Sequence, residues 1–216
     1  LRVSQFQDQT GQDLVDQMLA LTKAGAKSWV LDLRNNPGGT LSAAAKVADA
    51  FLTKGLIVTT KARQADDNLA FNATSNDPSQ KQPLAVLINN GSASASEIVA
   101  GAIQDLDRGI VIGQRSFGKG LVQQTKKLSY NSQLKLTVAK YYIPSGRCIQ
   151  ALDYSNRNED GSVGKVPDSL MTAFKTKNGR TVYDGGGINP DIEIDQDDIS
   201  NLIVSLIQER LFFDYA

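Results

Sequence analysis

The chain has 216 residues, 41% of them hydrophobic and 21% charged, and its 23 Lys and Arg balance its 23 Asp and Glu. This composition is typical of a globular protein and excludes a disordered or fibrous chain, and the length suits one large domain. Because the net charge is zero and no dense basic cluster is present, we expect no nucleic-acid partner.

The first half of the chain alternates strands and helices. Apolar spacing predicts a strand over 1–6, a helix from Gln12 to about Ala24 capped by Thr10, a strand over 28–33, a helix from Thr40 to about Leu52 and a strand over 56–61. After a polar surface excursion over 64–82, the pattern repeats with a strand over 84–88, a helix over about 95–106 and a strand over 109–112. Two strand, turn, helix units in series predict an α/β fold with a mostly parallel sheet, in which ligands gather where strands end.

The second half has an antiparallel pattern. Alternating residues predict strands over 121–128 and 133–142, joined by a turn. Residues 153–187 are polar, and we expect an ordered insertion or a flap with a short helix near 169–174. An amphipathic pattern over 197–213 predicts a final helix.

The sequence gives little information on the cellular compartment. The single cysteine, Cys148, cannot form an internal disulfide and is interpreted as a small strand residue, with a free thiol nucleophile as the alternative. No apolar run approaches the ~18 residues of a membrane span, and no segment resembles a signal peptide. Leu1 is not an initiator methionine, so we expect a longer protein whose N-terminal part carries the targeting signal.

A serine-rich loop, Asn89-Asn90-Gly91-Ser92-Ala93-Ser94-Ala95-Ser96-Glu97, precedes the second of the repeated helices. Ser94 stands just before this helix, where backbone N–H groups favour an oxyanion. Serine before a helix is also a common N-cap, so capping alone is the alternative for Ser92, Ser94 and Ser96. The turn containing Gly38 and Gly39 favours catalysis, because acyl transfer needs N–H donors about 3 Å from the developing oxyanion.

The chain contains no histidine, so a serine nucleophile here needs another base. Lys119, in Ser116-Phe117-Gly118-Lys119-Gly120, is the candidate because a desolvated lysine can be neutral near pH 7, although a lysine between glycines is usually exposed. Gln123 could hold the amine through its side-chain carbonyl or be a simple strand residue. Asp105 would favour a charged lysine, so we give it a structural or supporting role at most.

Three motifs stand in the order and at the spacing of a known family. They are Val-Leu-Asp-Leu-Arg-Asn-Asn-Pro-Gly-Gly at 30–39, Gly-Ser-Ala-Ser-Ala-Ser-Glu-Ile at 91–98, and Ser-Phe-Gly-Lys-Gly at 116–120 followed by Val122-Gln123. Through these motifs, and through Gly-Ile-Asn-Pro-Asp at 187–191, the chain resembles the carboxy-terminal processing peptidases, or tail-specific proteases, of the S41 serine peptidase family. The resemblance implies the ββα superhelix core shared by the Clp protease and crotonase superfamily.

The resemblance also implies roles for individual residues. Ser94 would be the nucleophile, Lys119 the general base and Gln123 the residue that orients the lysine, with the N–H groups of Ala95 and of Gly38 or Gly39 as the oxyanion hole. The implied activity is that of an endopeptidase that cuts proteins near their unstructured carboxyl ends through an acyl-enzyme, without a cofactor or metal. The implied location is periplasmic or otherwise exported, and the family resemblance also allows association with a membrane.

The chain departs from the family in two ways. The PDZ domain that usually precedes these motifs and binds the substrate's terminal carboxylate is absent, so we expect it upstream in the full-length protein. Residues 152–186 replace a normally short link. We therefore divide the chain into a catalytic core over 1–150, an insertion or flap over 151–187 and a closing strand and helix over 188–216. Within the insertion, the candidates for binding a carboxylate are Lys165, Lys175, Lys177 and Arg180.

Two other functions compete with the peptidase. A crotonase-like acyl-CoA enzyme would use the same pair of N–H groups to stabilise an enolate, but its site would need carboxylate acid and base residues in place of Ser94. A binding or scaffolding module could retain the peptidase fold without activity. The presence of Ser94, Lys119 and Gln123 together argues against such decay.

Overall fold

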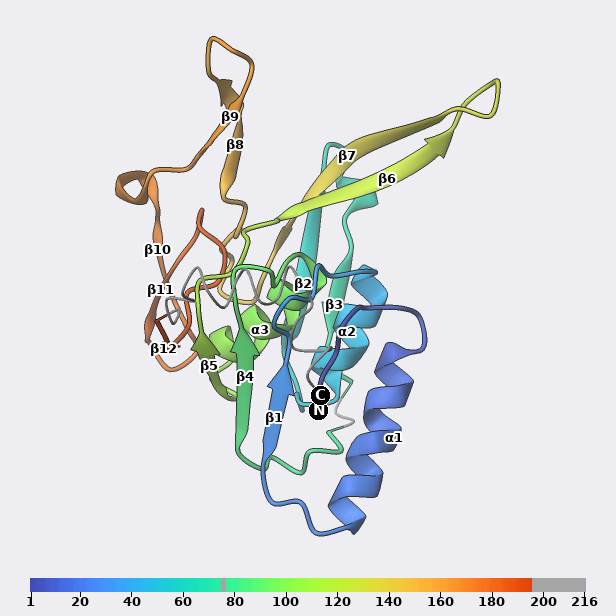
Figure 1. Ribbon diagram of the computed structural model, residues 1–216, viewed down its shortest axis with the longest axis vertical. Coiled ribbons are helices and arrows are strands. Elements are labelled where there is room, and N and C mark those ends of the chain that lie inside the picture. The colour runs from blue at the N-terminus through green and yellow to red at the C-terminus, as the bar shows by residue number, and fades with distance from the viewer. Residues whose placement is uncertain (75–76, 196–216) are drawn as a thin grey trace, which may run out of the picture.

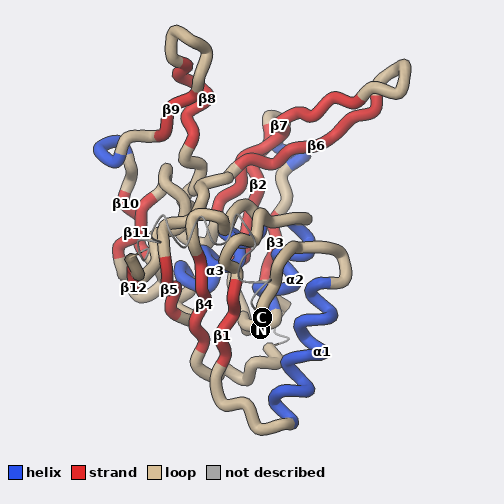
Figure 2. Tube along the Cα trace, in the orientation of Figure 1, coloured by secondary structure: helices blue, strands red, loops and turns tan. Residues whose placement is uncertain are grey.

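The computed structural model describes residues 1–74 and 77–195 and combines a parallel sheet, backed by helices, with an antiparallel sheet (Figures 1 and 2). The parallel sheet has the order β1-β4-β5-β12, and its strands are Trp29–Asp32, Leu84–Ile88, Ile110–Gly113 and Ile192–Glu193. In β4, Leu84, Val86 and Ile88 are buried, while the alternate residues are half-buried. This period of two is the one expected of a strand with one face on the core.

Among the described residues, α1 (Thr10–Lys23) packs on α2 (Leu41–Asp49), α2 packs on α3 (Ala95–Asp105), and α3 packs on β5 of this sheet. The Thr40 hydroxyl accepts a hydrogen bond from the Ala43 N–H and caps α2, as its sequence predicts. All eleven residues of α3 are buried, so this helix runs through the centre of the molecule. Its polar side chains must therefore find partners inside the protein.

The antiparallel sheet has the order β3-β2-β7-β6, with strands Ala70–Asn72, Leu56–Ala62, Gln133–Tyr142 and Leu121–Lys127. The ends of β2 and β7 join the core, and the β6–β7 hairpin projects from the body as a long arm (Figure 1). The register between β6 and β7 shifts at Val122 and Gln123, where β7 has one extra residue. Such a bulge re-aims neighbouring side chains, and both residues of β6 face the site described below.

Residues 151–187 form two hairpins. β8, Leu152–Arg157, pairs with β9, Val163–Lys165, and β10, Ala173–Lys175, pairs with β11, Thr181–Tyr183. Two 3₁₀ turns complete the described elements, η1 over Ala65–Asp67 and η2 over Asp168–Leu170. None of the helices in the described part of the chain is long and apolar enough to cross a membrane.

The α/β class and the alternating order of elements are confirmed, and three details differ. Residues 1–6 form only isolated bridges at Arg2 and Phe6 instead of a strand, because the chain bends between its pairing with β1 and its pairing with the glycine turn. The 64–82 excursion contributes β3 to a sheet. Residues 169–174 contain the end of η2 and the start of β10 where a short helix was expected. The helix predicted over 197–213 lies outside the described residues.

Candidate active site

A cleft of about 390 Å³ opens where the start of α3, the glycine turn and β6 meet. Five of the predicted site residues line it: Gly39, Ser94, Ala95, Lys119 and Gln123. Gly38 is buried and lies next to Ser94: a Cβ built on Gly38 would be 2.8 Å from the Ser94 Cβ. The fold therefore brings together residues from three separate motifs of the sequence.

Ser94 occupies an unusual backbone conformation, with φ of 56° and ψ of −112°. These angles match the first central position of a type II′ turn, which favours glycine, and a side chain there costs about 1–3 kcal/mol. Sharp, strained turns between a strand and a helix are used to expose catalytic serines. The turn thus places Ser94 in the cleft, at the amino end of α3.

The neighbouring Ser92 and Ser96 make buried structural hydrogen bonds. The buried Ser92 hydroxyl donates to the Leu33 carbonyl at 2.8 Å and accepts from the Asn89 N–H at 3.0 Å. The buried Ser96 hydroxyl donates to the Asn36 carbonyl at 2.9 Å. Neither residue lines the cleft. The loop's three serines are therefore distinguishable, and Ser94 alone of them is placed to meet a ligand in the cleft.

The two glycines of the turn differ in their hydrogen bonding. The Gly38 N–H donates to the Asn36 side-chain oxygen at 2.8 Å and is thus engaged. In contrast, the N–H groups of Gly39 and Ala95 have no acceptor among the described residues, and both residues line the cleft. Gly39 also sits where no side chain fits, because a Cβ would lie 1.9 Å from the Phe6 carbonyl oxygen. Of the two glycines, Gly39 is therefore the one whose N–H has no acceptor among the described residues.

Asn36 holds the glycine turn against the serine loop. The sequence did not reveal this role of Asn36. Its side chain is fully buried, donates to the Val3 carbonyl at 2.7 Å and accepts from the Gly38 N–H. Its backbone carbonyl accepts from the Ala93 N–H at 2.9 Å and from the Ser96 hydroxyl. One residue thus fixes the distance between the two loops that bear the free N–H groups.

Lys119 is half-buried, and its backbone is held at both ends. Its N–H donates to a Glu97 oxygen at 2.8 Å, and its carbonyl accepts from the buried Tyr141 hydroxyl. Burial and the charge of Glu97 raise the pKa of Tyr141, which keeps this donor protonated. Among the described residues, no hydrogen bond joins the Lys119 ammonium to the Ser94 hydroxyl, and such contacts often tighten only when substrate binds. Gln123 is exposed at the rim of the cleft.

Glu97 is the main site residue that sequence reasoning missed. It is fully buried and accepts four hydrogen bonds: from the Ser94 N–H at 2.8 Å, the Ser116 hydroxyl at 2.6 Å, the Gly118 N–H at 2.7 Å and the Lys119 N–H at 2.8 Å. One carboxylate thus ties the serine turn to the lysine loop. Its Ser-x-x-Glu spacing is that of a capping box and was visible in the sequence, but the bonds to residues 116–119 were not.

Burial raises the pKa of Glu97 to about 7, despite the four donors that favour its charged form. Because this pKa lies above the ordinary value of 4.5, the folded chain keeps the proton to higher pH than the unfolded chain. This retained proton stabilises the folded state fully below pH 4.5. The stabilisation is lost as the pH rises through about 7, a change of about 3 kcal/mol in the free energy of unfolding. Ionised Glu97 is nevertheless the form that can accept from all four donors.

We therefore expect Glu97→Gln to be poorly active at every pH, because the amide NH₂ faces N–H and hydroxyl donors and cannot accept from them. The loss should be about 10-fold or more in kcat/KM, against a smaller loss for Ser116→Ala, which removes one of the four donors. Chemical denaturation at pH 5 and pH 8 checks the titration. The free energy of unfolding of the parent should fall by about 2–3 kcal/mol more than that of Glu97→Gln over this interval, and equal pH dependence would contradict the assignment.

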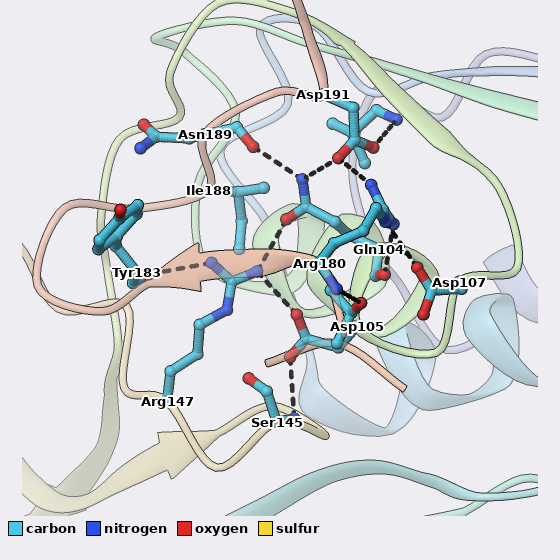
Figure 3. Close-up of polar contacts among 12 residues, drawn as sticks. Gln104, Asp105, Asp107, Ser145, Arg147, Arg180, Tyr183, Ile188, Asn189 and Asp191 are labelled. Atoms are coloured by element: carbon cyan, nitrogen blue, oxygen red, sulfur yellow. Dashed lines mark hydrogen bonds and ion pairs between the residues drawn. The ribbon is translucent and has the colours of Figure 1, made fainter. Parts of the chain in front are cut away.

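Asp105 lies outside the cleft, at the end of α3 opposite Ser94, and Figure 3 shows its polar contacts. Its carboxylate accepts from the fully buried Arg147 guanidinium at 2.8 Å and from the Ser145 N–H at 2.9 Å. Arg147 also donates to the side chain of Gln104 and to the Tyr183 carbonyl. Asp105 therefore anchors the carboxyl end of the helix, far along α3 from Ser94, and its contacts are structural.

The remaining candidates are also placed away from the cleft. Cys148 is half-buried, and burial raises the pKa of its thiol, which disfavours the reactive thiolate. Arg180 donates to Asp107 at 2.6 Å, pairs with Asp191 and is thus occupied (Figure 3). The Lys175 ammonium donates to the Thr181 hydroxyl at 2.7 Å. Lys165 and Lys177 remain exposed.

A serine in a strained turn at a helix start, facing two free backbone N–H groups, is the arrangement of serine hydrolases. The family model described as "Peptidase family S41" matches residues 1–156, and the chain belongs to this family. The chain is 49% identical over 156 residues to a carboxy-terminal-processing protease from Bartonella bacilliformis, covering 70% of this chain and 36% of that protein. It is 41% identical over 152 residues to a carboxyl-terminal-processing protease from Synechocystis, covering 70% and 35%.

The fold has a matching solved structure, a photosystem II D1 C-terminal processing protease. The TM-score is 0.68 at 30% sequence identity, with 92% of this chain and 42% of that chain covered. This likeness confirms the predicted S41 fold. The chain spans about a third of the length of the curated relatives it matches.

Proposed function

We propose that this chain is the catalytic part of a serine endopeptidase that cuts proteins near their unstructured carboxyl ends. The observation that supports the proposal is a cleft lined by Ser94 and Lys119 together with Ala95 and Gly39, whose N–H groups have no acceptor among the described residues. Membership of the S41 family and the names of the relatives point the same way.

In the proposed reaction, the Ser94 oxygen attacks the scissile carbonyl and the Lys119 amine takes its proton. The N–H groups of Ala95 and Gly39 stabilise the oxyanion. Lys119 then protonates the leaving amine, and water hydrolyses the acyl-enzyme by the reverse sequence of proton transfers. Gln123 orients the lysine from the rim of the cleft, and Glu97 holds the lysine loop against the serine turn.

The two competing functions have less support. In the described part of the chain, the residues that line the cleft include no aspartate or glutamate, whereas a crotonase-like enzyme needs carboxylates there. A scaffolding module would have no use for the strained turn at Ser94, which costs free energy without a binding role. Hydrolysis of a peptide tests the scaffolding alternative, and binding of coenzyme A tests the crotonase-like alternative.

Substrate capture and location are parts of the same proposal. A PDZ domain upstream of Leu1 would bind the terminal carboxylate, and export to the periplasm or an equivalent compartment would bring the enzyme to its substrates. These two inferences rest on the family resemblance.

We expect this chain by itself to cleave a peptide with a free carboxyl end and its amidated twin at similar rates. A longer form that restores the upstream residues should favour the free carboxylate, because a linked binding site raises avidity by about 10²-fold or more. The measurement is kcat/KM for both peptides on both proteins. A strong preference shown by residues 1–216 alone would mean that recognition lies within them, with Lys165 and Lys177 among the exposed cations of the insertion.

A further inference from the structure

A second cavity, of about 490 Å³, adjoins the catalytic cleft at β6, and we call it the insertion groove. Leu121 and Gln123 line both cavities, so the two are neighbours along β6. The other walls of the insertion groove are Thr137 and Lys140 of β7 and residues 152–155 of β8, with Val166 and Leu170 beyond them. Cys148 lies among the lining residues.

The insertion groove has a closed base and diverging walls. At the base, the Ala151 N–H donates to the Gly118 carbonyl at 2.9 Å, and the Gly120 N–H donates to the Gln150 side chain at 2.8 Å. Beyond these bonds, the β6–β7 and β8–β9 hairpins separate and point in different directions (Figure 1). Two hydrogen bonds thus fix the distance between the strands at the end nearest Lys119.

Both walls carry strands with an unused edge. In the described part of the chain, β6 pairs only with β7, and β8 pairs only with β9. A free strand edge presents unpaired N–H and C=O groups, and an extended peptide can pair with it as an added strand. A peptide paired with this edge beyond the closed base would cross Leu121 and Gln123, which also line the catalytic cleft.

The lining chemistry suits a polypeptide. Tyr154 is 50% exposed and Leu170 is 71% exposed, which leaves apolar surface open to a partner's side chains. The charged residues of the lining are Lys140, Asp153 and Asp184, one cation and two anions. A nucleic acid or another polyanion would meet two carboxylates there, whereas an extended peptide with apolar side chains would not be repelled.

We propose that the insertion groove holds an extended segment of the polypeptide substrate, continuous with the scissile bond in the cleft. This inference rests on the proposed function and adds where the substrate continues. An extended chain rises about 3.3 Å per residue, so five residues along β6 span about 17 Å. Substrates that extend about five residues beyond the scissile bond should therefore bind more tightly than shorter ones.

The test compares a peptide of four residues with one of twelve that contains the same scissile bond. In the double variant Tyr154→Asp and Leu170→Asp, we expect kcat/KM for the long peptide to fall about 10-fold, mainly through KM, because each tenfold loss equals about 1.4 kcal/mol of contact. Hydrolysis of the short peptide and labelling of Ser94 by a small serine-directed probe should be unchanged. Leu128→Asp is the matched control, since Leu128 is 52% exposed and lines neither cavity.

The outcomes separate the two proposals. If the parent chain is labelled at Ser94 and the ratio of long-peptide to short-peptide kcat/KM is the same in the double variant, the groove proposal is wrong and the proposed function stands. If the parent chain neither reacts with the probe nor cleaves either peptide, the proposed function itself fails.

A cross-link gives an independent readout, because Cys148 is the single cysteine of the chain and lines the insertion groove. Two long peptides would carry a bromoacetyl group about five residues to either side of the scissile bond, and the Ser94→Ala variant would prevent cleavage. One of them should alkylate Cys148, with loss of bromide, about 10-fold faster than bromoacetamide at equal concentration, since binding raises the local concentration. Equal rates for both peptides and bromoacetamide would overturn the proposal.

Discussion

Replacing Ser94 with alanine should reduce peptide hydrolysis by about 10⁴- to 10⁶-fold, the usual cost of removing a catalytic serine. Alanine keeps the Cβ and hence the strained turn, so the variant should fold like the parent. What it loses is the oxygen proposed to attack the substrate. The measurement is kcat on a peptide substrate, with circular dichroism to confirm the fold.

Ser92→Ala and Ser96→Ala are the matched controls for this prediction. Each removes a buried hydroxyl that donates to a backbone carbonyl, so each should cost about 1–3 kcal/mol of stability. Because neither residue lines the cleft, both variants should retain measurable turnover. If Ser94→Ala stayed active while one of the controls was inactive, the nucleophile would have to be reassigned.

Lys119→Arg should be inactive although it keeps the positive charge. The base must give up its own proton before it can accept the one from Ser94, and a guanidinium does not do so in proteins. We expect the loss in kcat to be about 10³-fold or more, within the range of general-base removal. The backbone bonds of residue 119 to Glu97 and Tyr141 do not depend on its side chain, so the loop should stay in place.

The pH profile of the parent adds a second check on this base. Since only the neutral amine can accept a proton, activity should rise with pH toward the alkaline range. Ionisation of Glu97, whose pKa is about 7, should contribute in the same direction. Near-parental turnover by Lys119→Arg, or activity that falls between pH 7 and pH 9, would be incompatible with the mechanism.

The parts of the fold that the sequence predicted are those set by local pattern. The apolar run of β4 and the alanine-rich α3 were expected within one or two residues, because burial and helix period are visible in a short window. The loops that follow β1 and β4 were expected at the site because ligands gather where parallel strands end. Ser94, Lys119 and Gln123 line one cleft, and their catalytic roles stay predictions.

The features that could not be predicted depend on residues distant in the chain. Glu97 looked like an ordinary first-turn residue because three of its four donors come from residues 116–119. The bond between Arg147 and Asp105 spans 42 residues, and Asn36 contacts Val3 across 33 residues. The hairpins of residues 151–187 are short and polar. Their strands are set by which segments pair, and the β-propensity of each segment alone does not predict them.

The central claim is that Ser94 forms the acyl-enzyme, and locating a covalent adduct tests it most directly. The parent chain would be treated with a serine-directed phosphonate probe, digested and mapped by mass spectrometry. We predict a single adduct on Ser94 that is absent from Ser94→Ala and strongly reduced in Lys119→Arg. An adduct on Ser92, Ser96 or Cys148 in the parent chain would contradict the assignment.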